Sequence, residues 1–247
     1  MIEYAAITSM DRKYWEKAGK AMLQSYKKHL SDVFPLYCYN EDGFNVKVKT
    51  VTPMGWNLGP AYAHFQSTIS NPKVRNFGKK AFSIIDAMNN VDADRLIWFD
   101  ADTVINARIP HHLLELISPN NVLSTHFGVK HHKNNTTYFS CETGFFILNM
   151  KHPKFNDFRD LYTKIYLEKQ TEGLRRFYDG EVYGKVVQTL EQQGIDMMEL
   201  NPGQRHKTPI PRSVIAPYLS HFKAGLKNRV DYDSLMDDDD DDYDDEV

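Results

Sequence analysis

Two carboxylates, Asp100 and Asp102, directly follow the apolar run 96–99, which reads LIWF. Four bulky residues bounded by charge predict a buried strand, and the carboxyl end of such a strand is where open α/β sheets bind ligands. Two carboxylates this close repel each other unless a cation lies between them. A divalent metal that also binds phosphate oxygens is the simplest such cation. We therefore expect a metal-dependent enzyme that acts on a phosphorylated or nucleotide-linked substrate.

The string FDADTV by itself leaves two enzyme classes open. It fits the D-x-D of metal-dependent glycosyltransferases. It also fits the D-x-D-x-[TV] of haloacid-dehalogenase-type phosphatases, in which Asp100 would attack phosphorus as the nucleophile. Such a phosphatase carries the motif on its first strand, whereas a long strand and helix pattern precedes it here. The position therefore favours the glycosyltransferase, and a non-catalytic glycan-binding protein remains a third alternative.

The segments before the acidic pair alternate between strand and helix patterns. Apolar strands are expected at 4–8 and 33–39, and the helix between them has apolar residues at helical spacing from Trp15 to Tyr26. Further along the chain we expect an edge strand, a loop and a helix at 45–51, 53–60 and 79–89. This alternation predicts an α/β fold with a mixed, mainly parallel sheet flanked by helices.

The pattern changes after the acidic pair. Strands are expected at 122–125 and 144–150, with the polar segment 131–140 as a loop between them. Helices are expected at 155–169 and 180–193, followed by a loop rich in proline and basic residues and by a short strand. The length of 247 residues fits a single domain over 1–235 with a tail at 236–247.

Composition is that of a globular protein, with 41% hydrophobic and 13% aromatic residues. No stretch reaches the ~20 apolar residues of a membrane span, and no signal peptide is visible, so we expect a cytoplasmic protein. Cys38 and Cys141 have no metal-site spacing and are expected to be buried free thiols in a reducing compartment.

Charge is distributed unevenly along the chain, although the net formal charge is only −3. Residues 237–247 contain eight Asp and one Glu and no Lys or Arg, so the rest of the chain carries about +6. A basic body suits a polyanionic ligand such as a nucleotide diphosphate. The tail is too polar to fold and is expected to be disordered. The basic residues form no stripe interleaved with aromatics, which argues against a nucleic-acid partner.

Five segments, in order, resemble the family-eight glycosyltransferases of the GT-A fold, which include glycogenin and bacterial lipopolysaccharide hexosyltransferases. The segments are AITSMDRKYWEKAGKAMLQSY, LIWFDADTVI, ETGFFILN, YDGEVYGKV and HFKAGLKNR. Together they span most of residues 1–230. The resemblance implies a GT-A fold and the transfer of a hexose from a nucleotide diphosphate sugar, a UDP-sugar by analogy, to a hydroxyl of a glycan acceptor. It favours retention of configuration at the transferred sugar.

The same resemblance implies a metal site made of Asp100, Asp102 and His221. A mixed set of carboxylates and an imidazole favours Mn²⁺ over Mg²⁺, which prefers oxygen ligands and keeps its waters. Tyr14 would stack on the base, and Lys227 would contact the diphosphate and offset the charge of the leaving nucleotide. The full set of implied nucleotide-binding residues is Thr8, Ser9, Tyr14, Arg75, Lys80, Asp100, Ala101, Asp102 and Lys227.

The chain departs from the family pattern in the sugar and acceptor region. Glu142 stands where the family has Asn, and Gly180 follows Asp179 where the family has Gln. Glu142 and Asp179 are the candidate catalytic carboxylates, because an inverting enzyme needs a base for the acceptor hydroxyl and a retaining one needs a group that stabilises the oxocarbenium-like centre. Asp179 at a helix start could instead be an N-cap. In the closing segment, Ala224 stands where the family has Gly.

Overall fold

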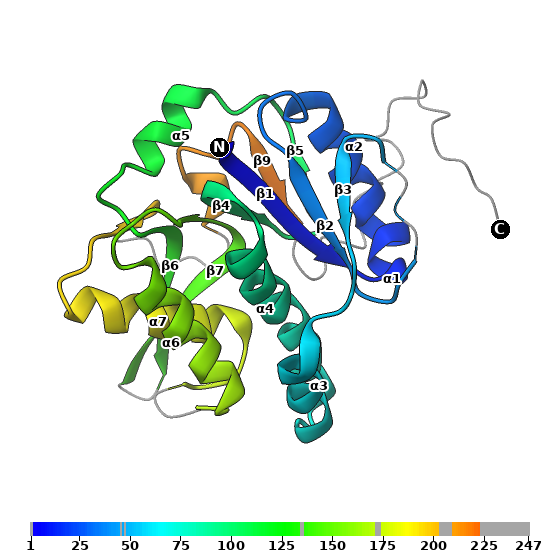
Figure 1. The fold of residues 1–247 in the computed structure, drawn as a ribbon. Helices are drawn as coiled ribbons and strands as arrows, with labels where there is room; N and C mark the ends of the chain where they lie inside the picture. Colours follow the sequence, from blue (N-terminus) through cyan, green and yellow to red (C-terminus); the bar gives the residue numbers. More distant parts are fainter. Residues whose placement is uncertain are drawn as a thin grey trace.

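The computed structural model describes residues 2–44, 46, 48–133, 136–170, 174–202 and 209–222. A seven-stranded sheet forms its centre, with the strand order β3-β2-β1-β4-β7-β6-β8 (Figure 1). The strands are β1 (Ile2–Met10), β2 (Leu36–Asn40), β3 (Val51–Met54), β4 (Ala93–Phe99), β6 (Ser124–Lys133), β7 (Thr136–Asn149) and β8 (Met197–Glu199).

The sheet is mixed and mainly parallel. Strands β1, β2, β3 and β4 run in one direction, and β7 pairs with β4 in the opposite direction. Strand β6 is antiparallel to β7, and β8 is parallel to β6, so β7 is the one strand of these seven that runs against the others. The fold class predicted from the sequence is confirmed.

Helices cover both faces of the sheet, which explains why β4 is apolar on both sides. Leu96 and Trp98 pack in a cluster with α3, α4, α6 and α7, whereas Ile97 and Phe99 pack in a second cluster with α2 and α5. The helical segments are α1 (Arg12–Tyr14), the π-helical η1 (Trp15–Gly19), α2 (Lys20–His29), α3 (Gly59–Thr68), α4 (Pro72–Asn90), α5 (His111–Ile117), α6 (Phe155–Leu167), α7 (Asp179–Gln192) and the 3₁₀ turn η2 (Ile210–Arg212).

A second, two-stranded sheet lies beyond the end of β4. It pairs β5 (Thr103–Ile105) with β9 (Leu219–His221) in antiparallel fashion, and Thr103 lies opposite His221. Figure 1 shows these two short strands side by side although they come from distant parts of the chain. This pairing brings the end of the described chain to the acidic pair.

Three sequence expectations about elements were wrong. The edge strand expected at 45–51 is β3, which begins only at Val51 and includes Pro53, a residue that an edge strand tolerates. Part of the loop expected at 53–60 is the start of α3. The loop expected at 131–140 belongs to β6 and β7, which extend as a hairpin beyond the rest of the sheet and pair as far as Lys133 and Thr136.

The expectations for one helix and for the two cysteines are confirmed. The helix expected at 79–89 lies within α4, which begins earlier, at Pro72, after the N-cap Asn71. Cys38 and Cys141 are buried free thiols. Among the described residues, no helix combines the length and the apolar character needed to cross a bilayer. Residues 236–247, the expected tail, lie outside the described residues.

Candidate active site

The acidic pair lies in the tight connection between β4 and β5. The Asp100 backbone N–H donates to the carbonyl of Gly144 on β7 at 3.0 Å, and Thr103 N–H donates back to the Asp100 carbonyl at 2.9 Å. The second bond closes a turn that places both aspartate side chains at the carboxyl end of β4. Asp102 is only 2% exposed. A buried carboxylate of this kind requires a cationic partner.

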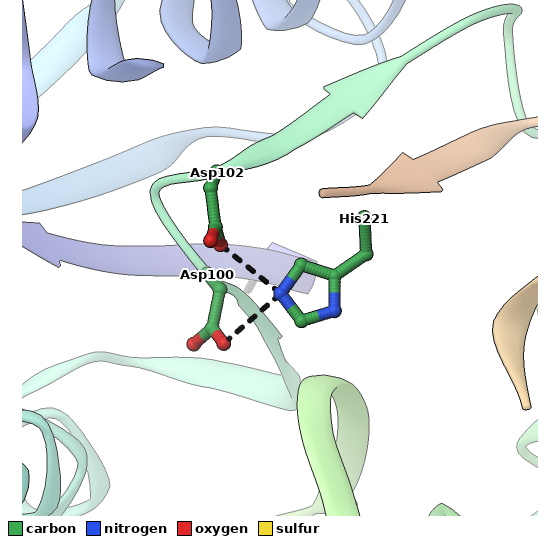
Figure 2. Close-up of side chains that lie close together, drawn as sticks. All are labelled: Asp100, Asp102 and His221. Atoms are coloured by element: carbon green, nitrogen blue, oxygen red, sulfur yellow. Dashed lines mark hydrogen bonds and ion pairs between the residues drawn. The ribbon is translucent and has the colours of Figure 1, made fainter. Parts of the chain in front are cut away.

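His221 provides that partner in the structure. Its Nε2 lies 3.0 Å from Asp102 Oδ1 and 3.4 Å from Asp100 Oδ2 (Figure 2). One oxygen from each aspartate and one imidazole nitrogen lie within 4.8 Å of one another. Two carboxylate oxygens and one nitrogen at this spacing can hold a divalent cation. The three residues named as metal ligands from the sequence therefore converge on one point.

The charge state of His221 follows from this contact. Burial by itself lowers the pKa of the imidazole, but hydrogen bonds and charge from Asp100 and Asp102 outweigh that effect and raise the pKa to about 9. The imidazole is therefore cationic at neutral pH and balances part of the charge on the two carboxylates. A divalent cation in this position would displace that proton and take over its role.

Lys80 holds the other oxygen of Asp100. Its Nζ lies 2.6 Å from Asp100 Oδ1, 2.6 Å from the Thr143 carbonyl and 3.1 Å from Asp179 Oδ2. Trp98 Nε1 donates to the same Asp100 Oδ1 at 2.7 Å, which leaves Oδ2 directed at His221. Burial would raise the pKa of Asp100, but the charges and hydrogen bonds of Lys80 and His221 together outweigh it and keep the pKa well below its usual range.

Lys80 is itself buried at 9% exposure and remains charged. Burial lowers its pKa, but Asp100 and Asp179 outweigh this and raise the pKa above its ordinary value. Lys80 therefore links the β4 end to the start of α7. The sequence prediction for Lys80 was a role in offsetting phosphate charge. The structure shows a further role, a bridge between Asp100 and Asp179.

Glu142 lies on the far side of the imidazole from the aspartates. Its Oε1 is 3.3 Å from His221 Nδ1 and accepts the Gly144 backbone N–H at 3.1 Å. Both Glu142 and His221 have side chains that are 6% exposed. Gly144 makes this packing feasible, because a Cβ at that position would collide with the imidazole ring. Glu142 thus contacts the candidate metal-ligand group. Its position there follows from β7, which pairs antiparallel with β4.

Asp179 is the first residue of α7 and faces the cleft. Its Oδ2 accepts the Thr143 hydroxyl at 2.7 Å and contacts Lys80. The N-cap of α7 is Tyr178, so the N-cap alternative for Asp179 does not hold. Gly180 allows the first turn of α7 to pack closely against β7, because a Cβ at this position would collide with the Cys141 carbonyl oxygen.

A cleft of about 510 Å³ surrounds these groups. It lies across the end of β4, with β1 on one side and β7 with the start of α7 on the other. Carboxylates far outnumber permanent cations among its described lining residues. The carboxylates are Asp11, Glu41, Asp100, Asp102, Glu142, Asp179 and Glu181, and the permanent cations are Lys80 and Arg175. The basic character of the chain's body is therefore not concentrated in the described lining, and a diphosphate would need a metal cation to enter.

Most of the sequence-predicted site residues meet in this cleft. Those that line it are Ser9, Tyr14, Lys80, Asp100, Ala101, Asp102, Glu142, Asp179 and His221. Thr8 is fully buried beside them. Arg75 is exposed and does not line the cleft, because it lies five residues before Lys80 on α4, about 140° around the helix. Lys227, together with Ala224, lies outside the described residues.

Sequence reasoning missed several lining residues. Glu41 follows β2 directly, at the same carboxyl edge of the sheet, and accepts the Ser9 hydroxyl at 2.8 Å. Burial raises the pKa of Glu41, with Lys79 opposing the shift. Its position after a strand could have indicated it. Phe77, Arg175, Tyr178 and Glu181 line the opposite side. Tyr178 and Glu181 lie in the segment YDGEVYGKV, where the resemblance gave them no role, and none of the five segments contains Phe77 or Arg175.

Comparison of the chain with known proteins identifies its fold. No protein-family profile matches the chain, and no curated protein matches it in sequence. Among solved structures, a glycosyltransferase involved in glycosylation of the major capsid of PBCV-1 matches with a TM-score of 0.54 and 13% identity, over 95% of this chain and 100% of that one. The galactosyltransferase LgtC, solved with donor and acceptor sugar analogues, matches with a TM-score of 0.54 and 11% identity over 94% of both chains.

The chain has the GT-A glycosyltransferase fold. A third match, the bifunctional glycosyltransferase WbbM, has a TM-score of 0.52 and 12% identity, and this chain covers 46% of it. The fold expected from the resemblance is thus confirmed. Identities this low establish the fold, and the activity must be argued from the site.

Proposed function

We propose that the protein is a metal-dependent glycosyltransferase that moves a hexose from a nucleotide diphosphate sugar, a UDP-sugar, to a hydroxyl of a glycan acceptor. The observation that carries this proposal is the convergence of Asp100, Asp102 and His221 at the end of β4, inside a cleft with a strongly acidic lining. A diphosphate enters such a cleft only together with a cation.

The donor set supports Mn²⁺ as the cation, with Mg²⁺ as the alternative, because an imidazole nitrogen accompanies two carboxylate oxygens. When bound, the ion would act as a Lewis acid for the departing nucleotide diphosphate. Asp100, Asp102 and His221 would hold it. Lys80 and Trp98 fix the orientation of the Asp100 carboxylate before any ligand arrives.

The two sides of the cleft suit the two parts of the donor. Ser9, Ala101 and Tyr14 line the β1 side and would bind the nucleoside, with Tyr14 against the base. The sugar would then lie on the β7 side, where Asp179 faces the cleft. Its carboxylate would stabilise the oxocarbenium-like centre in a reaction that retains configuration. The contact between Glu142 and His221 supports a role for Glu142 in holding the imidazole rather than in contacting the sugar.

The phosphatase alternative receives little support from the geometry. A nucleophilic aspartate needs one carboxylate oxygen free to attack phosphorus. In Asp100, Oδ1 is held by Lys80 and Trp98, and Oδ2 is directed at His221. The motif also follows the fourth strand of the sheet rather than the first.

The test is a melting-temperature screen with UDP and UDP-sugars, with and without Mn²⁺. We expect UDP and Mn²⁺ together to raise the melting temperature by about 5 °C or more at saturating ligand, and slow Mn²⁺-dependent hydrolysis of one UDP-sugar. Asp102→Asn should abolish both effects and keep the fold, whereas Asp160→Asn, on the exposed surface of α6, should change neither. Hydrolysis of p-nitrophenyl phosphate without any response to UDP-sugars would favour the phosphatase, and UDP-independent glycan binding alone would favour the non-catalytic protein.

A further inference from the structure

An aromatic pair forms part of the cleft wall on the β7 side. Phe77 of α4 and Tyr178, just before α7, have ring centroids 4.7 Å apart and planes inclined at 44°. Both are half-buried and both line the cleft. Phe77 belongs to none of the three hydrophobic core clusters of the described residues, and Tyr178 packs only at the margin of one. Large aromatic rings left at a water-filled cleft without a full core role are typical of ligand contacts.

The pair lies next to the reacting centre of the proposed function. Phe77 is one helical turn before Lys80, and Tyr178 directly precedes Asp179, while Lys80 and Asp179 contact each other at 3.1 Å. Strands β1 and β7 flank β4 on opposite sides. The aromatic pair is therefore on the opposite side of the metal-ligand group from Ser9 and Tyr14.

The permanent cations that line the cleft beside the pair are already compensated. Arg175 donates from Nε and Nη2 to Glu181 Oε1 at 3.1 and 3.0 Å, and Glu181 Oε2 accepts the Arg176 backbone N–H at 2.6 Å. Lys80 is neutralised by Asp100 and Asp179. Within the described lining, both permanent cations are thus engaged by carboxylates. Arg176, whose guanidinium carbon lies 5.6 Å from the Tyr178 ring centroid, is exposed and stands outside that lining. Inside the cleft an anionic acceptor would meet mainly the acidic wall.

We propose that Phe77 and Tyr178 form the platform of the acceptor site and that the acceptor is an uncharged pyranoside that packs its C–H face on these rings. This inference rests on the proposed function. The electron-rich face of an aromatic ring attracts the weakly positive C–H groups of a sugar ring, and packing excludes water from both. The remaining N–H groups of Arg175 are available to donate to the sugar hydroxyls at the rim.

The test is saturation-transfer NMR of the full chain with UDP and Mn²⁺. The probes are methyl α- and β-glucopyranoside, methyl β-galactopyranoside and the anionic methyl β-glucuronopyranoside. We expect saturation of the ring C–H protons of a neutral pyranoside. Phe77→Leu and Tyr178→Leu should each reduce it at least about fivefold, consistent with loss of about 1 kcal/mol of ring contact. Phe44→Leu, at an aromatic pair outside the cleft lining, should keep it.

The same samples distinguish a failure of the proposed function from a failure of this inference. The UDP and Mn²⁺ affinity of the unmodified protein tests the proposed function, and this inference predicts that both leucine variants change it less than twofold. A variant that weakens UDP binding instead would show that the rings stack the base, and it would overturn the inference. Unchanged saturation in both variants, preference for the glucuronoside, or no signal from any of the four probes would also overturn it, even where UDP binds with Mn²⁺.

Discussion

Glu142 Oε1 lies 3.3 Å from Nδ1 of His221, while Nε2 of the same ring faces the two aspartates. A carboxylate behind a ligating imidazole fixes the ring's orientation and raises its basicity toward a metal. We therefore expect Glu142→Ala to weaken Mn²⁺ binding about 10- to 100-fold. Glu142→Gln keeps an oxygen acceptor and should therefore lose less Mn²⁺ affinity. Electron paramagnetic resonance measures the concentration of free Mn²⁺ and so gives the affinity directly.

A matched control for this prediction is Glu191→Gln, a change on the exposed side of α7 that should leave Mn²⁺ affinity unaltered. Equal affinities for Glu142→Ala and the unmodified protein would mean that the imidazole is held in place by its packing over Gly144 alone.

Lys80→Met should destabilise the protein by about 3 kcal/mol, because it leaves the carboxylates of Asp100 and Asp179 without their shared cation. Urea unfolding measures the change. Adding Asp179→Asn to the same chain should recover part of the loss, since it removes one of the two carboxylates that Lys80 pairs with. A double variant no more stable than Lys80→Met would argue that lost packing, and not charge, accounts for the effect.

Gly180→Ala should cost about 1–3 kcal/mol of stability, because the added methyl would collide with the backbone carbonyl of Cys141, which cannot move without shifting β7. Gly55→Ala is the matched substitution, since a Cβ there would contact nothing within 4 Å. Thermal unfolding of the two variants side by side provides the measurement, and equal melting temperatures would contradict the proposed contact.

Acid should destabilise the fold through His126, a buried residue outside the cleft lining. Burial lowers its pKa to about 4, against the small opposing effect of a backbone hydrogen bond at Ser124. Between that value and the unfolded pKa of about 6.5, the unfolded chain binds more protons, so this contribution to stability is complete above pH 6.5 and falls as the pH drops. Between pH 7.5 and pH 5 we expect a loss of about 2 kcal/mol from this residue.

Urea unfolding at the two pH values measures that loss, with His126→Gln as the comparison. The variant should show a pH dependence smaller by that amount. The same pH dependence in both proteins would mean that the imidazole of His126 is not held neutral by burial.

The centre of the fold could be predicted because its sequence signal is strong. The run 96–99 is buried on both faces, and this is why its apolar pattern is continuous and why Asp100 and Asp102 follow at the sheet edge. The hairpin at 131–140 was missed for the opposite reason. There β6 and β7 pair mainly with each other, so polar residues are tolerated and the periodic pattern is lost.

The site was only partly predictable from the sequence. His221 was named from the resemblance alone, since no local pattern links it to Asp102, which is 119 positions earlier. The bridge from Lys80 to Asp179 depends on how α4 and α7 pack against the sheet, which local spacing does not encode. Arg75 illustrates the same limit, because only the orientation of α4 in the structure shows that this residue faces away from the cleft.

The pairing of β5 with β9 has a consequence for how the protein is made. The two aspartates leave the ribosome long before residue 221, so a nascent chain carries the oxygen ligands without the imidazole. Only a chain synthesised past residue 221 can assemble all three groups, and an ion bound there would act as a removable cross-link between β4 and the last described strand. A chain that ends before that strand therefore holds both carboxylates but lacks the imidazole that completes the group.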